Sequence, residues 1–562
     1  MFDLIIKNGL IVDGSGLPAF AGDVAISDGR IRKIGKLNAP ARHSVDAKGK
    51  VIAPGFIDPH THFDAQLLWD GACKPAVEHG VTTVIPGNCS LSLAPLKAEH
   101  RKKLVGMFNQ IEEMPLKAFE VGVEWDWETF AEFVERLERD LTINVAPLVG
   151  HSVLRLWVMG DAAMQRTATP EEVVQLQALL RECLEAGAVG LSTSFIDMDE
   201  TLQPVPSRYA DAAELDALAA VLGEYGRMLQ IVHEFFDADV SVARVDELAN
   251  LSLKHGIPTT LSPVLVNAND TVVADKIMAR VREHAAMGAR VWPQVQTRPI
   301  DISFSFEVPS LLFIRMRGWY AIMRHGSHDD IVKAFSDPER RPELVQEAAS
   351  MNSMWEQLVL RQVQTANNQA LVGMKLVDIA AQRNTGIVDT MIDLSLEEDL
   401  QAHFLFADMG HNDSQKVAAL LTDPLVHIGA SDGGAHILSF ATYGDTGYLF
   451  SKFVRDEAAM SLESAVKKVT YDVANIWGLP ERGLLQEGYV ADITIFDPDT
   501  VDRGPEYYVQ DVPGEGSRYV RAAIGIDTVI IGGEIAYEQE AGYTGSKRGQ
   551  VLPGATRQIE SQ

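Results

Sequence analysis

The sequence predicts an α/β protein, a (β/α)₈ TIM barrel with a small β domain built from both chain termini. Two observations predict this fold. From about residue 51 to residue 430, apolar runs of strand type alternate with stretches of helical periodicity, which is typical of a parallel sheet with right-handed crossovers. Short strand-like segments without a helical pattern between them occur at the two ends of the chain. A closed barrel with insertions suits this length best, and a doubly wound open sheet is the alternative.

The two ends of the chain predict a separate β domain. Within residues 1–54, segments such as Phe2–Ile6 and Leu10–Val12 are separated by the turn signals NG, GSG, SDGR and AKGK. Strand patterns return within residues 480–562, for example at Ile526–Ile531. Because each set of strands otherwise lacks partners for its sheet edges, we expect the two segments to form one small β domain.

We expect the barrel within residues 55–479, with insertions near 91–126 and 299–388. The stretch Ser303–Tyr320 in the second insertion is rich in Phe, Leu, Ile and Trp, and either lines a hydrophobic substrate pocket or packs as a core helix. The expected helices include Glu171–Glu185, Ala212–Tyr225 and Ala274–Ala286. The expected strands include Val81–Pro86, Thr142–Leu148, Ala188–Ser192, Met228–Val232, Thr259–Leu265, Arg290–Gln296 and Val426–Ala430.

Composition excludes several classes of function. Hydrophobic residues make up 46% and charged residues 23% of the chain, which excludes extensive disorder. The formal net charge is −29, and a chain this acidic repels nucleic acids and anionic membranes. The sequence has no apolar run long enough for a transmembrane helix, and its N-terminus lacks the pattern of a signal peptide. With only three cysteines, we expect a cytoplasmic protein without a disulfide framework.

Two histidines directly follow the first expected barrel strand. An apolar run ends at Ile57 and is followed by Asp58-Pro59-His60-Thr61-His62. Residues i and i+2 of an extended chain project from one face, so both imidazoles can reach one metal ion. The carboxyl end of a barrel strand is also where active sites lie. The alternative is a polar loop with two solvent-exposed histidines.

Cys89 and His233 also follow expected strands. A thiolate is a strong zinc ligand, and a metal ion beside Cys89 lowers the pKa of the thiol enough to ionise it. His233 directly follows the strand Met228–Val232, where a metal ligand of a barrel should lie. A buried apolar cysteine and a core histidine are the alternatives.

Asp432 is the candidate general base, because a carboxylate after the last expected strand can act on a metal-activated water. A turn or helix-cap residue is the alternative for Asp432. We expect His151, Arg298 and His436 to contact substrate. His151 follows an apolar strand and can also bind metal, and His436 can orient Asp432. Arg298 can clamp a carboxylate, with a surface or structural arginine as the alternative.

These residues, in this order, resemble the amidohydrolase superfamily and within it the N-acyl-D-amino-acid deacylases (D-aminoacylases). The matching motifs span almost the whole chain: DLIIKNGLIVDGSG, VIAPGFIDPHTHFD, TTVIPGNCS, PLVGHSVLR, AVGLSTS, SDGGAH and GLLQEGYVADITIFDP. The resemblance implies a metal-dependent (β/α)₈ barrel with a small β-sandwich domain. It implies Zn²⁺, one or two per subunit, held by His60, His62, Cys89, His233 and Asp432, with Asp432 as the catalytic residue.

The sequence departs from the family pattern at one ligand. The family has a second downstream histidine and a lysine that holds the substrate carboxylate after the next strand, but this chain reads TTLSPVL over residues 259–265. Ser262, Asn267 or a water molecule can complete the metal shell, since catalytic zinc needs only three protein ligands. Alternatively the ion lies mainly with the histidine pair and Asp432, or the chain binds no metal and is a non-hydrolytic relative.

The expected function is metal-dependent hydrolysis of a C–N amide bond in an N-acyl (D-)amino acid, or in a bulkier and less charged N-acyl amide. A cyclic-amide (hydantoinase-like) or lactone hydrolase is one alternative, although hydantoinases usually bridge two metals with a carboxylated lysine where this strand ends in Asn88-Cys89. A non-catalytic assembly protein with the amidohydrolase fold is the other. A small-molecule amide is the expected partner, with no nucleic acid, no membrane and a homo-oligomeric state.

Overall fold

The computed structural model describes residues 1–554 except 236, 267–271, 308–309, 314–315 and 430. The chain divides into two compact units. The first contains Met1–Arg298, Asp413–His436 and Thr442–Gln562, and the second contains Pro299–Asn412 and Ile437–Ala441. The second unit therefore includes the predicted insertion at 299–388, while the other predicted boundaries stay predictions.

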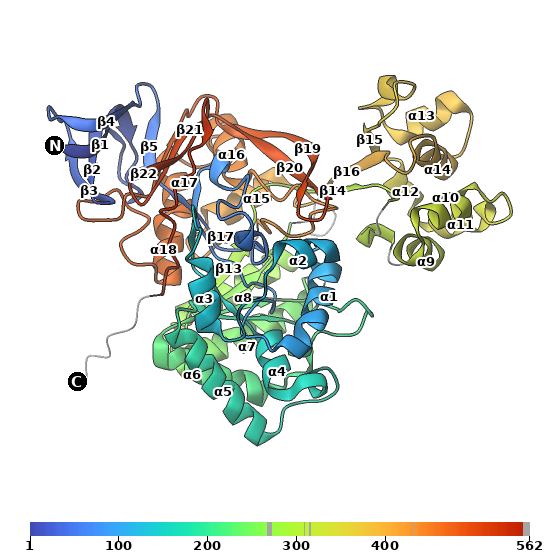
Figure 1. Cartoon of the computed structure of the whole chain (residues 1–562), viewed down its shortest axis with the longest axis horizontal. Helices are drawn as coiled ribbons and strands as arrows, with labels where there is room; N and C mark the ends of the chain where they lie inside the picture. The colour runs from blue at the N-terminus through green and yellow to red at the C-terminus, as the bar shows by residue number, and fades with distance from the viewer. Residues whose placement is uncertain (236, 267–271, 308–309, 314–315, 430, 555–562) are drawn as a thin grey trace. The chain divides into compact units, whose positions relative to one another are not determined.

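Strands from both ends of the chain form one nine-stranded sheet in the first unit, where blue and red ribbons lie in the same sheet (Figure 1). Its order is β23-β22-β21-β18-β5-β1-β2-β3, with β4 paired to β1. The two ends meet where β5 pairs antiparallel with β18, so that Ile52 lies opposite Ile495. The bounds are β1 Phe2–Ile11, β2 Phe20–Ser27, β3 Arg30–Gly35, β4 Ala41–Asp46, β5 Val51–Pro54, β18 Ile493–Phe496, β21 Ile526–Ile531, β22 Glu534–Glu538 and β23 Gly542–Tyr543.

The first strand differs from its prediction. The two short strands expected on either side of Asn8-Gly9 form the single strand β1, with an irregularity of register between Ile6 and Gly9. Asn8 has a φ of 63°, and its backbone N–H and side-chain amide donate to the carboxylates of Asp23 and Asp46. The Asn-Gly pair is a turn signal in sequence, but here these partners satisfy its polar groups inside the sheet as a bulge.

Parallel strands alternate with helices through the rest of the first unit. They form a three-stranded sheet, β6-β7-β8, and a six-stranded sheet, β17-β13-β12-β11-β10-β9. The intervening helices include α5 Pro170–Glu185, α6 Ala212–Tyr225, α7 Ala238–His255 and α8 Val272–Ala286, which confirms the three predicted helices. The strands are β6 Phe56–Asp58, β7 Val81–Val84, β8 Asn144–Val145, β9 Val149–Gly150, β10 Gly190–Ser194, β11 Met228–Val232, β12 Thr259–Ser262, β13 Val291–Val295 and β17 His427–Ile428.

The two parallel sheets are connected at both edges. β8 and β9 lie in one stretch, residues 144–150, and the Ala146 N–H in that stretch donates to the Val84 carbonyl and continues the pairing with β7. At the opposite edge the chain after β6 meets the chain after β17, because the His62 N–H donates to the Gly433 carbonyl at 2.7 Å. The carboxyl ends of β6 and β17 therefore lie side by side.

Local sequence fixes where the helices begin and end. At the start of α5, the Thr169 side chain accepts from the Glu172 N–H while the Glu172 carboxylate accepts from the Thr169 N–H, which forms a capping box. Asp211 caps α6, and Gly226, with a φ of 66°, ends it in the left-handed conformation that glycine adopts most readily.

The second unit has a core of its own. It contains the antiparallel sheet β14-β16-β15, formed by Ile300–Phe304, His403–Gly410 and Val359–Gln362, together with short helices such as α9, Arg317–His325. Its buried core is rich in aromatic side chains, namely Phe304, Phe306, Phe313, Trp319, Phe335, Trp355 and Phe404. Four of these come from the stretch Ser303–Tyr320, so for them the core alternative holds.

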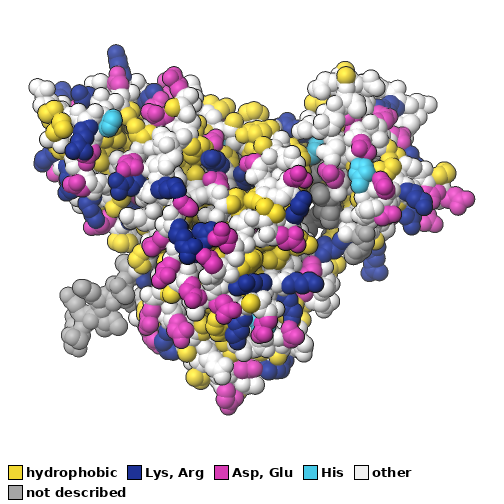
Figure 2. Space-filling model, viewed as in Figure 1, with side chains coloured by type: hydrophobic (Ala, Val, Ile, Leu, Met, Phe, Trp, Pro, Cys, Tyr) yellow, Lys and Arg dark blue, Asp and Glu magenta, His cyan; other side chains and the backbone are white. Residues whose placement is uncertain are grey.

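The surface carries charged side chains of both signs (Figure 2). On the face that Figure 2 shows, Asp and Glu side chains are interspersed with Lys and Arg. Among the described residues, none of the helices is long and apolar enough to cross a membrane.

Candidate metal centre

The two histidines after β6 are buried, and each ring is held at Nδ1. His60 Nδ1 lies 2.8 Å from Gln294 Oε1 of β13, and His62 Nδ1 forms an ion pair with Glu112 Oε1 at 2.9 Å. An acceptor at Nδ1 places the proton there and leaves the Nε2 lone pair available. Metal-ligating histidines are usually held in this way.

Glu112 lies one residue beyond helix α1, Arg101–Ile111, in the segment predicted as an insertion. Its carboxylate is only 1% exposed. Burial by itself lowers the pKa of His62, but the Glu112 and Asp432 carboxylates outweigh burial and raise the pKa to about 9. The carboxylates thus favour positive charge at this ring, which either a proton or a metal ion can supply.

Cys89 follows β7 in a backbone conformation that is unusual for a residue with a side chain. Its φ is 53°, and the preceding Asn88 donates its side-chain amide to the carbonyls of Ile85 and Thr61. The Cys89 Sγ lies 3.5 Å from His60 Nε2. Burial raises the pKa of this thiol well above its usual value, so a cation beside it is needed to form the thiolate.

Asp432 reaches the same point from the chain after β17, whose last predicted residue, Ala430, lies outside the described residues. The Ser431 hydroxyl donates to the Asp58 carboxylate at 2.7 Å and lies 2.9 Å from the His60 carbonyl, which fixes this turn against the end of β6. Asp432 itself has a φ of 56°, and its side chain is 32% exposed. It is therefore both firmly placed and accessible to small molecules.

The four groups fit a divalent metal ion with nitrogen, sulfur and oxygen ligands. The ligand atoms of His60, His62 and Cys89 all lie within 4.8 Å of one another. Asp432 Oδ1 lies 3.3 Å from His60 Nε2 and 3.9 Å from His62 Nε2. Ligands of a tetrahedral zinc ion, with bonds of about 2.0–2.3 Å, lie about 3.3–3.6 Å apart. The donor set and its spacing match such a site with little rearrangement.

His233 lies outside this three-residue group. Its Nε2 is 3.1 Å from the Pro263 carbonyl, and its buried Nδ1 has no hydrogen-bond partner among the described residues. Burial lowers the pKa of this ring to about 4, so it is a neutral imidazole. Ser262, one of the predicted replacements for the missing family histidine, accepts a hydrogen bond from Gln230, and Asn267 lies outside the described residues.

Two of the predicted substrate contacts are engaged within the protein. His151 lies between Thr193 Oγ1 and the Glu214 carboxylate, at 3.0 and 2.8 Å. The Arg298 guanidinium pairs with Asp445 at 2.8 Å. These contacts give both residues a structural role, and their contact with substrate stays a prediction.

His436, the third predicted contact, is half-buried with a φ of 48°. Burial raises the pKa of the nearby Asp197 carboxyl to about 6, against the opposing effects of the Ser194 hydrogen bond and of the His62 and His436 rings. Asp197 and His436 therefore belong to the surroundings of the metal centre.

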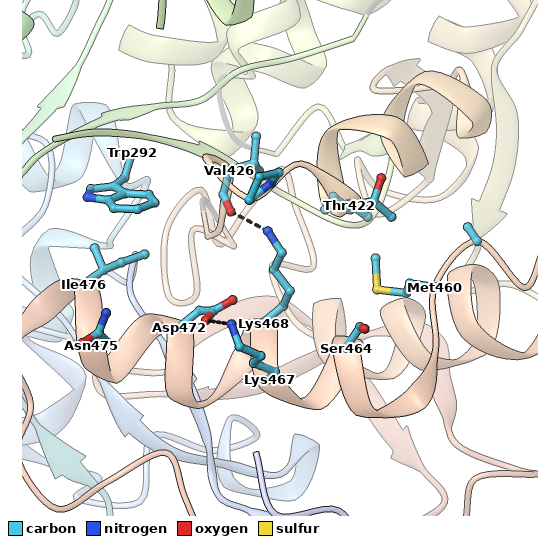
Figure 3. A pocket seen from close by; sticks show the side chains of 13 residues that line it. Trp292, Thr422, Val426, Met460, Ser464, Lys467, Lys468, Asp472, Asn475 and Ile476 are labelled. Carbon is cyan, nitrogen blue, oxygen red and sulfur yellow. Dashed lines mark hydrogen bonds and ion pairs between the residues drawn. The ribbon is translucent and has the colours of Figure 1, made fainter. Parts of the chain in front are cut away.

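A cavity at the opposite, amino ends of the strands contains none of the predicted site residues. It has a volume of about 550 Å³, and Figure 3 shows Trp292 of β13 and Val426, just before β17, in its lining. Lys468 donates to the Val426 carbonyl at 2.8 Å, and Lys467 pairs with Asp472. The described candidate ligands therefore lie at the carboxyl ends of the strands, away from this cavity.

Comparison with known proteins places this site in a family. The sequence profile described as Amidohydrolase family matches residues 44–250 and 360–537. The chain belongs to the amidohydrolase family. This confirms the predicted resemblance and the predicted class of enzyme, a hydrolase of carbon–nitrogen bonds other than peptide bonds.

Relatives of this amidohydrolase match it over nearly their whole length. The D-aminoacylase of Alcaligenes xylosoxydans xylosoxydans is 28% identical, covering 98% of this chain and 97% of the relative. The N-acyl-D-glutamate deacylase of the same organism is 30% identical, covering 96% and 94%. A crystal structure of N-acyl-D-glutamate deacylase from Bordetella bronchiseptica, complexed with zinc and a phosphonate inhibitor, has a TM-score of 0.68 at 28% identity and covers 98% of this chain and 100% of that one.

Proposed function

We propose that this amidohydrolase hydrolyses a C–N amide bond of a small N-acyl compound, using Zn²⁺, one or two ions per subunit, and Asp432 as the general base. One observation carries the proposal, namely the convergence of two imidazoles, a thiol and an accessible carboxylate at the carboxyl ends of parallel strands. The relatives are named for the hydrolysis of N-acyl-D-amino acids, which supports the amide class.

The residues of the site fall into two groups, those that would bind the metal ion and those that orient the ligands. His60, His62 and Cys89 would hold the ion, and Gln294 and Glu112 keep the two rings oriented through Nδ1. When bound, a divalent ion supplies a Lewis acid that polarises the amide carbonyl and lowers the pKa of water from 15.7 to about 7.

Asp432 carries out the proton transfers in this proposal. Its Oδ1 accepts a proton from the attacking water and later gives it to the leaving nitrogen, so the carboxylate is regenerated in each turnover. The 32% exposure of the side chain supports this role, because the reacting groups can reach it. A second ion would need His233, whose buried Nδ1 is a candidate ligand atom.

The proposal includes a closed (β/α)₈ barrel with a small β-sandwich domain. Eight stretches of parallel chain support it, namely β6, β7, the 144–150 stretch, β10, β11, β12, β13 and β17, together with the backbone contact between His62 and Gly433. A cytoplasmic location and a homo-oligomeric state stay predictions.

Metal analysis and a substrate panel test this function. We expect the purified protein to contain at least one equivalent of zinc, to release free amine from N-acyl amino acids or amides, and to lose this activity in chelator and regain it with Zn²⁺. The panel includes both enantiomers, cyclic amides and lactones, which separates the alternative hydrolases. Less than about a tenth of an equivalent of metal, with unchanged stability in chelator, favours a non-catalytic assembly protein instead.

A further inference from the structure

We propose that the amine portion of the substrate carries no carboxylate, so that this enzyme acts on N-acyl amides whose amine portion is neutral or cationic. This inference rests on the proposed function and names the substrate class of the same site. It follows from two features of the described residues of the first unit: four arginines around the strand ends already contact protein groups, and carboxylates surround the metal centre.

Arg298, the residue predicted to bind a substrate carboxylate, already donates its hydrogen bonds to groups of the protein. It is 5% exposed, its Nε donates to Asp445 Oδ2 at 2.8 Å, and its Nη2 donates to the Ser431 carbonyl at 2.7 Å. Asp445 also accepts the Thr297 N–H. If Arg298 turned to a substrate carboxylate, the Asp445 carboxylate and the Ser431 carbonyl would lose the hydrogen bonds that Arg298 donates to them. This loss is costly because the Asp445 charge would then be buried without its partner.

His151 and Arg155 both contact the Glu214 carboxylate. His151 contacts one oxygen of this carboxylate at 2.8 Å, and the fully buried Arg155 pairs with the other. Arg155 also donates to the Arg166 carbonyl at 2.7 Å. The Glu214 side chain is 1% exposed, so the Arg155 guanidinium balances a buried charge inside the protein and is not available to a substrate.

Arg208 and Arg244, which contact the segments that follow β10 and β11, are also engaged. Arg208 donates to the carbonyls of Ile196 and Asp197 at 3.0 and 3.2 Å. Arg244 pairs with both Glu234 and Glu247, and its guanidinium stacks 3.5 Å from the centre of the Phe195 ring.

The metal centre itself carries an excess of negative charge. Carboxylates gather around the three ligand residues: Glu112 pairs with His62 Nδ1 at 2.9 Å and Asp432 lies 3.3 Å from His60 Nε2. Asp197 and Asp64 lie close enough to act on the Cys89 thiol as well. With one divalent ion bound, the Cys89 thiolate and the Asp432 carboxylate already balance its two charges. Glu112 and Asp197 then leave a negative balance, which repels a substrate carboxylate in a medium of low dielectric constant. The net charge of −29 adds repulsion at longer range.

Matched substrates test the inference. The probes are N-acetyl-D-phenylalanine and its carboxamide, each with its L enantiomer, and N-acetylglycine against N-acetylethylenediamine. We expect kcat/KM for the neutral or cationic member of each pair to exceed that of the carboxylate by about tenfold or more. Higher salt should raise kcat/KM for the carboxylates and leave the neutral amides unchanged. Equal or faster hydrolysis of the carboxylates would overturn the inference.

A charge variant sharpens the test. Asp197→Asn removes one negative charge near the centre, and we expect it to narrow the ratio between neutral and carboxylate probes. Asp161→Asn, which removes an exposed charge elsewhere, is the control and should leave the ratio unchanged. A ratio that does not respond to Asp197→Asn contradicts the electrostatic cause.

Measuring the binding of reaction products tests this inference independently of whether the proposed hydrolysis occurs. If no probe is hydrolysed, the proposed function fails, and calorimetric binding of the products then decides the substrate class alone. Tighter binding of D-phenylalaninamide than of D-phenylalanine supports the inference, and the reverse order contradicts it.

Discussion

The polar side chains at the carboxyl ends of the parallel strands differ from those at the amino ends in whether they are available to a ligand. At the carboxyl ends, Cys89 and Asp432 have left-handed backbones, and a thiol, two imidazoles and a carboxylate share one small space. At the amino ends, around the cavity of Figure 3, Lys468 donates to main-chain carbonyls and Lys467 pairs with Asp472. The carboxyl ends keep metal-ligand atoms available at a cost in backbone strain, whereas both of these lysines at the amino ends are bound to protein acceptors.

Among the available groups at the carboxyl ends, Asp432 is the proposed general base, so we expect its substitution to have the largest effect on activity. Asp432→Asn keeps the size of the side chain and removes the proton acceptor, so kcat should fall by about 10²–10⁴-fold. Zinc content and the thermal midpoint should stay close to those of the wild type. The measurement is steady-state kinetics together with elemental analysis. Near-normal turnover would remove Asp432 from the base role.

Glu112 should control metal affinity rather than the chemistry. Glu112→Gln removes the charge that faces His62 Nδ1, and losing such a partner typically weakens metal binding by about 10–100-fold. Chelator competition measures the zinc affinity directly, without reference to activity. Glu113→Gln, the same change one residue later, is the matched control. Equal losses in both variants would show a general effect of the segment instead.

Lys468 should affect stability without affecting activity. Lys468→Met removes the donor to the Asp423 and Val426 carbonyls, and buried acceptors left without a donor cost about 1–3 kcal/mol. Lys467→Met breaks a partly exposed ion pair and should cost about 1 kcal/mol or less. Urea unfolding and kcat/KM are measured on both variants. A loss of kcat/KM in Lys468→Met would mean that the amino ends contribute to function.

The site residues that could be predicted from the sequence are those with a recognisable position relative to a strand. His60, His62 and Asp432 directly follow apolar strands, and parallel strands bring their carboxyl ends to one edge, so order along the chain predicts proximity. Gln294 carried a weaker signal, since it is a polar residue within an apolar strand. The alternation of parallel strands with helices was likewise predicted, whereas the Asn8-Gly9 bulge was not, because its outcome depends on distant carboxylates.

The residues that sequence reasoning missed depend on tertiary contacts. Glu112 comes from a segment with no strand pattern, and only folding brings it to His62. The engagement of Arg298 by Asp445 joins residues far apart in the chain, so the sequence left its role open. Ion pairs of this kind follow no periodicity, which is why the partners of the site were harder to predict than its ligands.

The smallest expected effect is a pH dependence from the amino end of β7. His79 ends the short helix Val77–His79, and burial lowers the pKa of its imidazole to about 4, against the opposing hydrogen bond to the Arg521 carbonyl. The unfolded chain takes up this proton near pH 6.5 and the folded chain only near pH 4, so stability is present above pH 6.5 and lost as the pH falls. Between pH 7.5 and 5.5 the loss is about 1.3 kcal/mol.

His79→Gln should remove this part of the acid sensitivity, because glutamine does not titrate and can still donate to the Arg521 carbonyl. The urea midpoint of the variant should therefore fall less between pH 7.5 and 5.5 than that of the wild type. His403, which burial likewise holds at a pKa of about 4, lies in the second unit, so His403→Gln is the comparison and should reduce the acid sensitivity of that unit instead. An unchanged acid response in His79→Gln would mean that a group other than His79 takes up the proton on unfolding. The amino ends of the strands would then contribute nothing to the acid sensitivity through this histidine.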